Sequence, residues 1–201
     1  MVRKVQRWIH SGPGRWSFLT AAVVAAWMAT SVAKEKTPAN ANFDSVRAHS
    51  ISLVDDQGRP RLILAAPLPN PRVAGKEYPR SNPVYGFQFL DADGNETGGL
   101  ALIDKMGGGA FCFDYNTAEA FCVTKTRDSV YVQLLDPPAP GDPVGKPGPA
   151  RIVISQEKGD AGITLSDHAG KDRIILGVNK DAAAGLKMLD AEGHELFREP
   201  H

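Results

Sequence analysis

The stretch Ile51-Ser-Leu-Val-Asp-Asp-Gln-Gly-Arg-Pro-Arg-Leu-Ile-Leu64 decides the fold, because apolar residues flank an Asp-x-x-Gly turn and the pattern recurs downstream. The side chain of an Asp that opens a turn can accept hydrogen bonds from backbone N–H groups ahead of it. A Gly three residues later supplies the positive φ of a type I turn closed by a G1 bulge. The stretch therefore predicts a β-hairpin.

The same hairpin is repeated along the chain. Six units open their turns at Asp55, Asp91, Asp114, Asp136, Asp167 and Asp190. Four units have Gly three residues later, which gives the turn-forming pairs Asp55 and Gly58, Asp91 and Gly94, Asp167 and Gly170, and Asp190 and Gly193. Two irregular inserts, residues 67–83 and 136–148, explain the longer spacings. The underlying period is about 23 residues, which is typical of one hairpin per repeat.

Side chains two and four residues before each Asp share one face of the sheet. All are apolar: Ile51/Leu53, Phe87/Phe89, Ala110/Cys112, Val132/Leu134, Ile163/Leu165 and Leu186/Met188. The opposite face of these strands carries both polar and apolar side chains. Returning strands such as residues 62–64 and 174–176 are apolar on both sides, so both of their faces need to be buried.

These patterns predict an all-β domain of six hairpin repeats in an up-and-down meander. We expect the meander to close as a barrel or a sandwich, so that no long edge stays open. The alternative is an extended sheet, whose apolar strands another chain would have to bury, with self-association as one route.

The N-terminal region has the pattern of an export segment. Residues 1–15 form a basic leader, and residues 16–33 form an uncharged, mostly apolar run that ends at Lys34. The run has roughly the 18 residues that a membrane-spanning helix needs, which favours a signal anchor. The small residues ending at Ala33 also allow a cleaved signal peptide. We expect one hydrophobic helix here, a linker over residues 34–45, and a repeat domain over residues 46–201 outside the cytoplasm.

Charge argues against one class of partner. The formal net charge is +0, and residues 1–33 hold four of the 23 basic residues and no acidic residue. Residues 34–201 therefore carry 23 − 4 = 19 basic groups against 23 acidic ones. No basic run is present, so the sequence predicts no binding to nucleic acid.

Cys112 and Cys122 flank the third turn and are the only cysteines of the chain. Strict repeat register makes them diagonal neighbours, but Thr117 replaces the turn Gly, so the turn could re-register and bring them face to face. A disulfide and a pair of buried thiols both stay open. Two Cys without a clustered His fall short of a zinc site.

Other candidate motifs are better explained as turns and surface groups. Residues 91–96 (Asp-Ala-Asp-Gly-Asn-Glu) superficially resemble a calcium loop but lack the EF-hand spacing. Arg61, Arg151 and Arg173 recur where each can form an exposed ion pair with a turn Asp, and an arginine row binding an anion is the alternative. The histidines of the domain, His49, His168, His194 and His201, lack companions at triad or ligand spacing. We therefore predict no catalytic residue, no metal site and no cofactor.

The two irregular segments are expected to lie at opposite ends of the strands, because strands alternate in direction along a meander. In that arrangement they do not build a common site, and each is interpreted as a spacer.

The string Leu-x-Asp-x-x-Gly-x-x-Arg followed by an apolar triplet occurs at residues 53–64 and 165–176. It resembles exported or membrane-anchored bacterial proteins of unknown function that carry such repeats in series. The resemblance covers residues 49–199 and transfers no functional residue.

Three functions are consistent with the sequence. The first is a non-enzymatic, membrane-anchored, extracytoplasmic module with a structural or protein-interaction role, including self-association. The second is a module for a saccharide or small ligand, motivated by the aromatic third hairpin with Phe111, Phe113, Tyr115 and Phe121. The third is a hydrolase of an unrecognised type, which has only scattered carboxylates in its favour.

Overall fold

The computed structural model describes residues 41–199. The basic leader and the hydrophobic helix expected over residues 1–33 lie outside the described residues, as does most of the linker. Within residues 41–199, no helix has the length and apolar character needed to cross a membrane.

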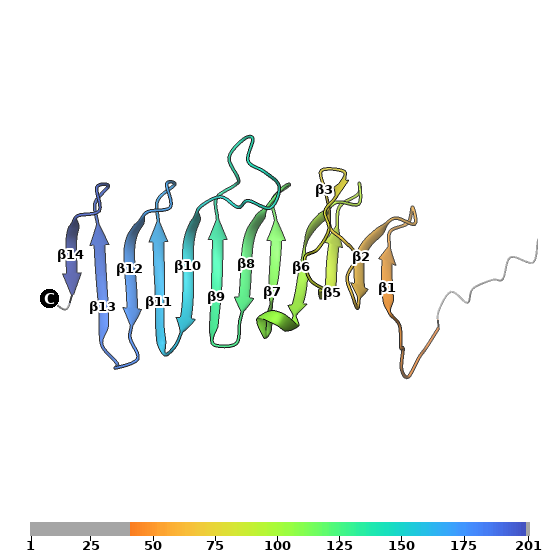
Figure 1. The fold of residues 1–201 in the computed structure, drawn as a ribbon, viewed down its shortest axis with the longest axis horizontal. Helices are drawn as coiled ribbons and strands as arrows, with labels where there is room; N and C mark the ends of the chain where they lie inside the picture. The colour runs from red at the N-terminus through yellow and green to blue at the C-terminus, as the bar shows by residue number, and fades with distance from the viewer. Residues whose placement is uncertain (1–40, 200–201) are drawn as a thin grey trace, which may run out of the picture. The chain divides into compact units, whose positions relative to one another are not determined.

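A single antiparallel sheet of twelve strands contains all six hairpins, in chain order (Figure 1). Its strands are β1 (Ser50–Val54), β2 (Pro60–Ala65), β5 (Tyr85–Leu90), β6 (Glu96–Ile103), β7 (Gly108–Asp114), β8 (Glu119–Lys125), β9 (Ser129–Leu135), β10 (Ala150–Glu157), β11 (Asp160–Ser166), β12 (Asp172–Val178), β13 (Ala184–Leu189) and β14 (Glu195–Glu199). A short 3-10 helix, η1 (Asp104–Met106), joins β6 to β7, and the β2–β5 connector holds a small ribbon of β3 (Arg72–Val73) and β4 (Lys76–Glu77). The prediction of an all-β hairpin meander is confirmed.

The expected closure into a barrel or sandwich is wrong for the described residues. The sheet runs from β1 at one edge to β14 at the other, and the described strands form no second large sheet. A barrel requires a register stagger that accumulates from strand to strand. Here hairpins of similar length repeat side by side at one level (Figure 1). The stagger does not accumulate, and the edges do not meet.

The turn aspartates fix the register of the hairpins. In the turns of Asp55, Asp91, Asp167 and Asp190, Oδ1 accepts the backbone N–H groups two and four residues ahead, at 2.8–3.0 Å. The Gly three residues after each Asp has φ between 75° and 93°, in the left-handed region. Each turn therefore ends in the same bulge and aligns the next strand in the same way.

The third hairpin departs from this alignment. Tyr115, not Asp114, donates its backbone N–H across the turn, to the carbonyl of Ala118 at 2.8 Å. The pairs Phe113 with Phe121 and Cys112 with Cys122 follow from this shorter turn. Placing Ala110 and Cys112 on the same face as the apolar pairs of the other hairpins was wrong, because the third unit is shifted by one residue and Phe111 and Phe113 occupy that face instead.

One face of the sheet, hereafter the apolar face, carries two continuous rows of side chains that cross the strands. The row nearer the turns is Leu53, Leu62, Phe89, Gly98, Phe113, Phe121, Leu134, Ile152, Leu165, Ile174, Met188 and Phe197. The second row is Ile51, Leu64, Phe87, Leu100, Phe111, Val123, Val132, Ile154, Ile163, Leu176, Leu186 and Glu199. From β1 to β13 neither row contains a charged residue.

Phenylalanine rings fill the gap that Gly98 leaves in the first row. Phe89 and Phe113, on either side of Gly98, stack with centroids 5.7 Å apart and an interplanar angle of 4°. Phe87 and Phe111 make edge-to-face contacts with them. Gly98 has φ 139°, and a Cβ there would lie 2.3 Å from the carbonyl oxygen of Cys112, so a larger residue is excluded.

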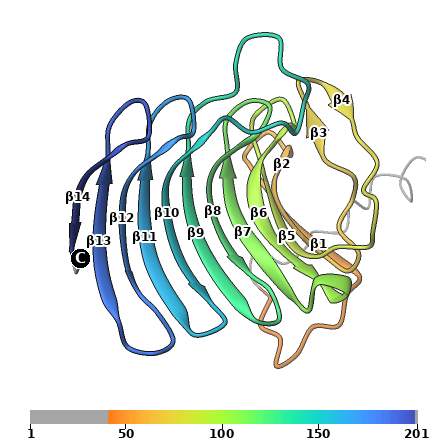
Figure 2. The same ribbon diagram turned by 60° about the vertical axis from the view of Figure 1, so that its left-hand side comes forward.

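The opposite face, hereafter the concave face, carries side chains of mixed size and polarity, such as Gln133, Thr164 and Lys187. The strands bow along their length, and the β2–β5 connector lies on the inner side of the bow (Figure 2). Gly162, Gly177 and Gly185 lie side by side on this face. These three glycines leave the inner side of β11, β12 and β13 free of side chains at that level.

The connector over residues 66–84 covers the first part of the concave face. Ala65, Leu68 and Val84 form a small buried cluster, against which Ile63 and Ala101 pack. Leu68 donates its backbone N–H to the carbonyl of Val84 at 2.7 Å. The connector therefore covers the concave face over the first strands of the sheet.

Cys112 and Cys122 form a disulfide on the concave face. They are direct cross-strand partners in β7 and β8, with a Cα–Cα distance of 4.2 Å. Both cysteines of the chain are thereby bonded, and Cys122 is buried.

Replacing both cysteines, Cys112→Ser with Cys122→Ser, is expected to lower the free energy of unfolding by about 2–3 kcal/mol, because the unfolded chain loses a closed loop. Urea denaturation of the full chain in detergent micelles measures this. The control is Ala110→Ser with Thr124→Ser, a neighbouring cross-strand pair on the same face. Equal midpoints for the two double variants would contradict the stabilising role of the disulfide.

Candidate functional site

The two irregular segments meet over the concave face, which corrects the expectation that they lie at opposite ends. The connector leaves β2 at the end away from the Asp-Gly turns but crosses the sheet to reach them, where Gly75 donates its backbone N–H to Asn95 Oδ1 at 2.8 Å. The 136–148 insert reaches the same region, where Gly145 donates to the carbonyl of Thr117 at 2.8 Å. A cavity of about 250 Å³ lies between them, lined by side chains that include Tyr78, Arg80, Glu96, Asp114 and Tyr115.

An ion pair anchors the connector to the sheet. Arg80 lies 3.2 Å from the carboxylate of Glu96, which also accepts a 2.8 Å hydrogen bond from Gln88 Nε2. The side chain of Gln88 is buried, with 1% exposed. This polar contact was not predictable from the sequence, because nothing in the spacing of Arg80 and Glu96 indicates that the connector crosses the sheet.

Asp114 faces this cavity and does not cap its turn. Burial of the carboxyl raises the pKa of Asp114 to about 6, and the nearby negative charges of Glu96 and Glu119 act in the same direction, while Arg80 opposes them. The turn aspartates behave differently. A side-chain hydrogen bond from Asn95 lowers the pKa of Asp91, and the backbone N–H of Lys171 lowers the pKa of Asp167.

The recurring arginines join neighbouring hairpins. Arg61 and Arg151 lie 3.6 and 3.2 Å from Asp55 and Asp136, and Arg173 contacts Asp167. Arg61 Nε also donates to the carbonyl of Leu90 at 3.1 Å, and Arg151 Nε to that of Ser166 at 2.8 Å, each in the next hairpin. Arg173 donates to Ala191 of the last hairpin at 3.0 Å. These contacts favour the ion-pair interpretation over an anion-binding row.

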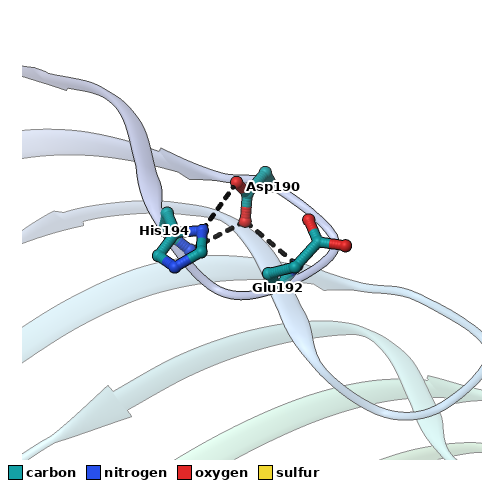
Figure 3. A group of neighbouring side chains, drawn as sticks. All are labelled: Asp190, Glu192 and His194. Atoms are coloured by element: carbon teal, nitrogen blue, oxygen red, sulfur yellow. Dashed lines mark hydrogen bonds and ion pairs between the residues drawn. The ribbon is translucent and has the colours of Figure 1, made fainter.

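The histidines of the turns contact aspartates that already have partners. His168 Nδ1 lies 2.7 Å from Asp136, the same carboxylate that Arg151 contacts, and its side chain is 85% exposed. His201 lies outside the described residues. In Figure 3, Asp190, Glu192 and His194 lie within one turn, with their potential ligand atoms inside 4.8 Å of one another. Because Asp190 accepts the backbone N–H groups of Glu192 and His194, this cluster is explained as a capped turn.

In the segment 91–96, the side-chain oxygens of Asp91 and Glu96 also accept hydrogen bonds within the fold. Asp91 accepts from its own turn and from Asn95 Nδ2 at 3.0 Å, and Glu96 binds Arg80 and Gln88. These side chains do not converge on a common point, which favours the turn over a calcium loop.

A shallow groove of about 800 Å³ lies over the last strands of the concave face. Its floor includes Gly162, Gly177 and Gly185, and Lys187 and Arg198 line it. Glu195 lies 3.8 Å from Lys187 and 3.7 Å from Arg198. The groove is open, and its basic side chains Lys187 and Arg198 already have a carboxylate neighbour.

The largest exposed apolar feature of the described residues is the apolar face. Eighteen large apolar side chains are exposed among the described residues, and thirteen of them project from this face, including Leu134 at 41%, Ile154 at 45% and Leu176 at 49%. Scattered exposed apolar side chains are ordinary on protein surfaces, whereas a continuous patch of this size is typical of a protein, membrane or ligand contact surface.

The size of the face follows from strand geometry. Twelve strands at about 4.8 Å spacing extend roughly 58 Å, and two side-chain rows cover about 14 Å along the strands, giving about 800 Å². The largest apolar patch on a typical monomer measures about 300–600 Å². The candidate functional site is therefore this face.

Comparisons with known proteins give no further assignment. No family model, no curated protein and no solved structure matches the chain. The resemblance to exported bacterial proteins with serial Leu-x-Asp-x-x-Gly-x-x-Arg repeats stays a prediction.

Asp114→Asn is expected to stabilise the protein at pH 8. The pKa of the folded state, about 6, lies above the ordinary value of 3.8, so the folded state binds more protons between these values and loses stability as pH rises through them. An uncharged amide removes this cost, and we expect a gain of about 1–2 kcal/mol after allowing for partial exposure.

Urea midpoints at pH 8 and pH 4.5 measure this, and the gain should shrink at the lower pH. Asp128→Asn, at an exposed position between β8 and β9, is the control. A gain that does not depend on pH would show that the charge of Asp114 is not its cause.

Proposed function

We propose that this protein is a non-enzymatic, extracytoplasmic β-repeat module with a structural or protein-interaction role, and that the apolar face is its contact surface. The single observation that carries the proposal is the continuous exposure of that face from β1 to β14. A protein surface of about 800 Å² per partner corresponds to a standard specific interface. An uncharged centre is also typical of the buried part of such interfaces.

The disulfide supports placement outside the cytoplasm. Cys112 and Cys122 are bonded, and disulfides persist mainly in oxidising compartments. The basic leader over residues 1–15 and the apolar run over residues 16–33 support export in the same direction. We propose that the run anchors the module in the membrane, with cleavage after Ala33 as the alternative.

The saccharide-binding alternative has weaker support. Sugar sites combine exposed aromatic rings with polar groups that accept and donate hydrogen bonds. Phe111 and Phe113 pack edge-to-face against each other, and the hydroxyl of Tyr115 donates to the carbonyl of Leu135 at 3.1 Å. The rows around Phe113 are apolar, so the aromatic cluster is better explained as part of the contact surface.

The hydrolase alternative has one feature in its favour, the raised pKa of Asp114 beside Glu119 in a cavity. Glu96 in the same cavity is bound by Arg80 and Gln88. The packing of the connector against the sheet accounts for this arrangement without a reaction.

A photoreactive amino acid placed at Ile163 of the full chain in a bacterial host is expected to form adducts with another protein chain. Ile163 is 38% exposed on the apolar face, and the adjacent Thr164 projects from the concave face and provides the matched control. Denaturing gels and mass spectrometry would measure adduct yield and mass. Equal or absent adducts at the two positions would contradict the apolar face as the contact surface.

A further inference from the structure

We infer that the partner of the apolar face is a second copy of this chain, packed face to face so that each sheet supplies the missing second layer of the other. This inference rests on the proposed function and names the partner. The resulting dimer is a two-layer β-sandwich between chains, with the apolar rows of both sheets in its centre.

The buried area meets what a stable dimer needs. The two central rows of the apolar face cover about 800 Å² on each copy by strand geometry, so two copies bury about 1,600 Å². A standard specific interface buries the same total. Burial of this much apolar surface favours association.

The low twist between successive strands of the sheet also points to a second sheet. Adjacent strands normally rotate by about 20–25°, which accumulates to a strong twist over many strands. In Figure 1 the axes of the antiparallel strands from β1 to β14 stay nearly aligned with one another. Sheets that stay flat over many strands are typically stabilised by stacking on another sheet. A second copy offers a sheet of equal length, strand spacing and flatness.

The bow of the strands does not prevent this contact. The apolar face is the outer side of the bow, so the strand ends turn away from a partner (Figure 2). The two rows lie next to each other near the middle of the strands, about 7 Å apart along each strand. The contact is therefore a strip that crosses the strands, with long side chains such as Phe113, Leu134 and Met188 facing the partner.

Charge is arranged as in a protein interface. The centre of the strip is uncharged from β1 to β13, while ion pairs such as Asp55 with Arg59 and Asp167 with Arg173 line the turn end of the sheet. A polar rim around an apolar centre is typical of specific interfaces. The edge strand β14 carries Glu195, Arg198 and Glu199, and charges of this kind disfavour pairing of sheet edges.

The test uses two full-length copies with different affinity tags, expressed together in a bacterial host and extracted in mild detergent. Purification through one tag should recover the other copy, and native mass spectrometry should give the mass of a dimer. Leu134→Glu with Ile154→Glu in both copies places charges in both rows near the middle of the sheet, and it is expected to reduce recovery at least tenfold.

The matched control is Gln133→Glu with Ser155→Glu, which adds the same charges at adjacent positions on the concave face. Recovery in this control should stay at the level of the natural chain. Circular dichroism and protection of the Cys112–Cys122 disulfide from reduction test whether each variant folds.

A charge-complementary pair keeps the inference falsifiable if the acidic variant folds poorly. One copy carries Leu134→Glu with Ile154→Glu, and the other carries Leu134→Lys with Ile154→Lys. Faces of opposite charge should restore recovery at least fivefold over two acidic copies.

Three results would overturn the second copy as partner. One is a monomeric natural chain, the second is a dimer that survives charges on the apolar face, and the third is flotation of the monomer with lipid vesicles through the apolar face. Photoadducts of Ile163 with a different protein, together with a monomeric chain, would overturn this inference and leave the proposed function intact. Absence of any adduct specific to the apolar face would overturn the proposed function as well.

Discussion

The pair of backbone hydrogen bonds that each turn aspartate accepts is the interaction on which the rest of this structure depends. In four hairpins one carboxylate oxygen accepts two backbone N–H groups, and the following Gly takes a left-handed φ. Side chains alternate between faces, so a slip of one residue would move a whole strand's apolar set to the other side. The repeated turn prevents this slip and aligns one apolar pair per strand into rows that cross the sheet.

This alignment also explains why residues 41–199 do not cover their own apolar face. Hairpins that repeat in the same register at the same level build a long sheet without the stagger that closure requires. The connector between β2 and β5 is the segment that turns back over the sheet, and it packs on the concave face through Leu68 and Val84. Each apolar side chain added by a further repeat therefore enlarges the face that the described residues leave exposed.

Sequence reasoning predicted the hairpins because their signals are local. An Asp, a Gly three residues later and apolar residues at alternate positions specify a turn and two strands without reference to distant parts of the chain. It misplaced the third hairpin, because Asp114 stands one residue before the position that closes the turn and Thr117 offers no glycine to mark the register. The path of the connector was also unpredictable, since the pairing of Arg80 with Glu96 depends on tertiary contacts.

The apolar face was partly predictable from the sequence, because the signals of its strands are also local. The apolar pairs before each turn were readable from the sequence, but whether they face an internal core or a partner depends on closure, which is a property of the whole sheet. Barrel, sandwich and open sheet share one alternation pattern, and strand stagger distinguishes them. In this chain, equal hairpins keep stagger low and the sheet flat, and the same two properties that prevent internal closure make the face well matched to a second sheet of identical spacing. The fold's regularity thus connects the turn aspartates directly to the assembly between chains that we propose.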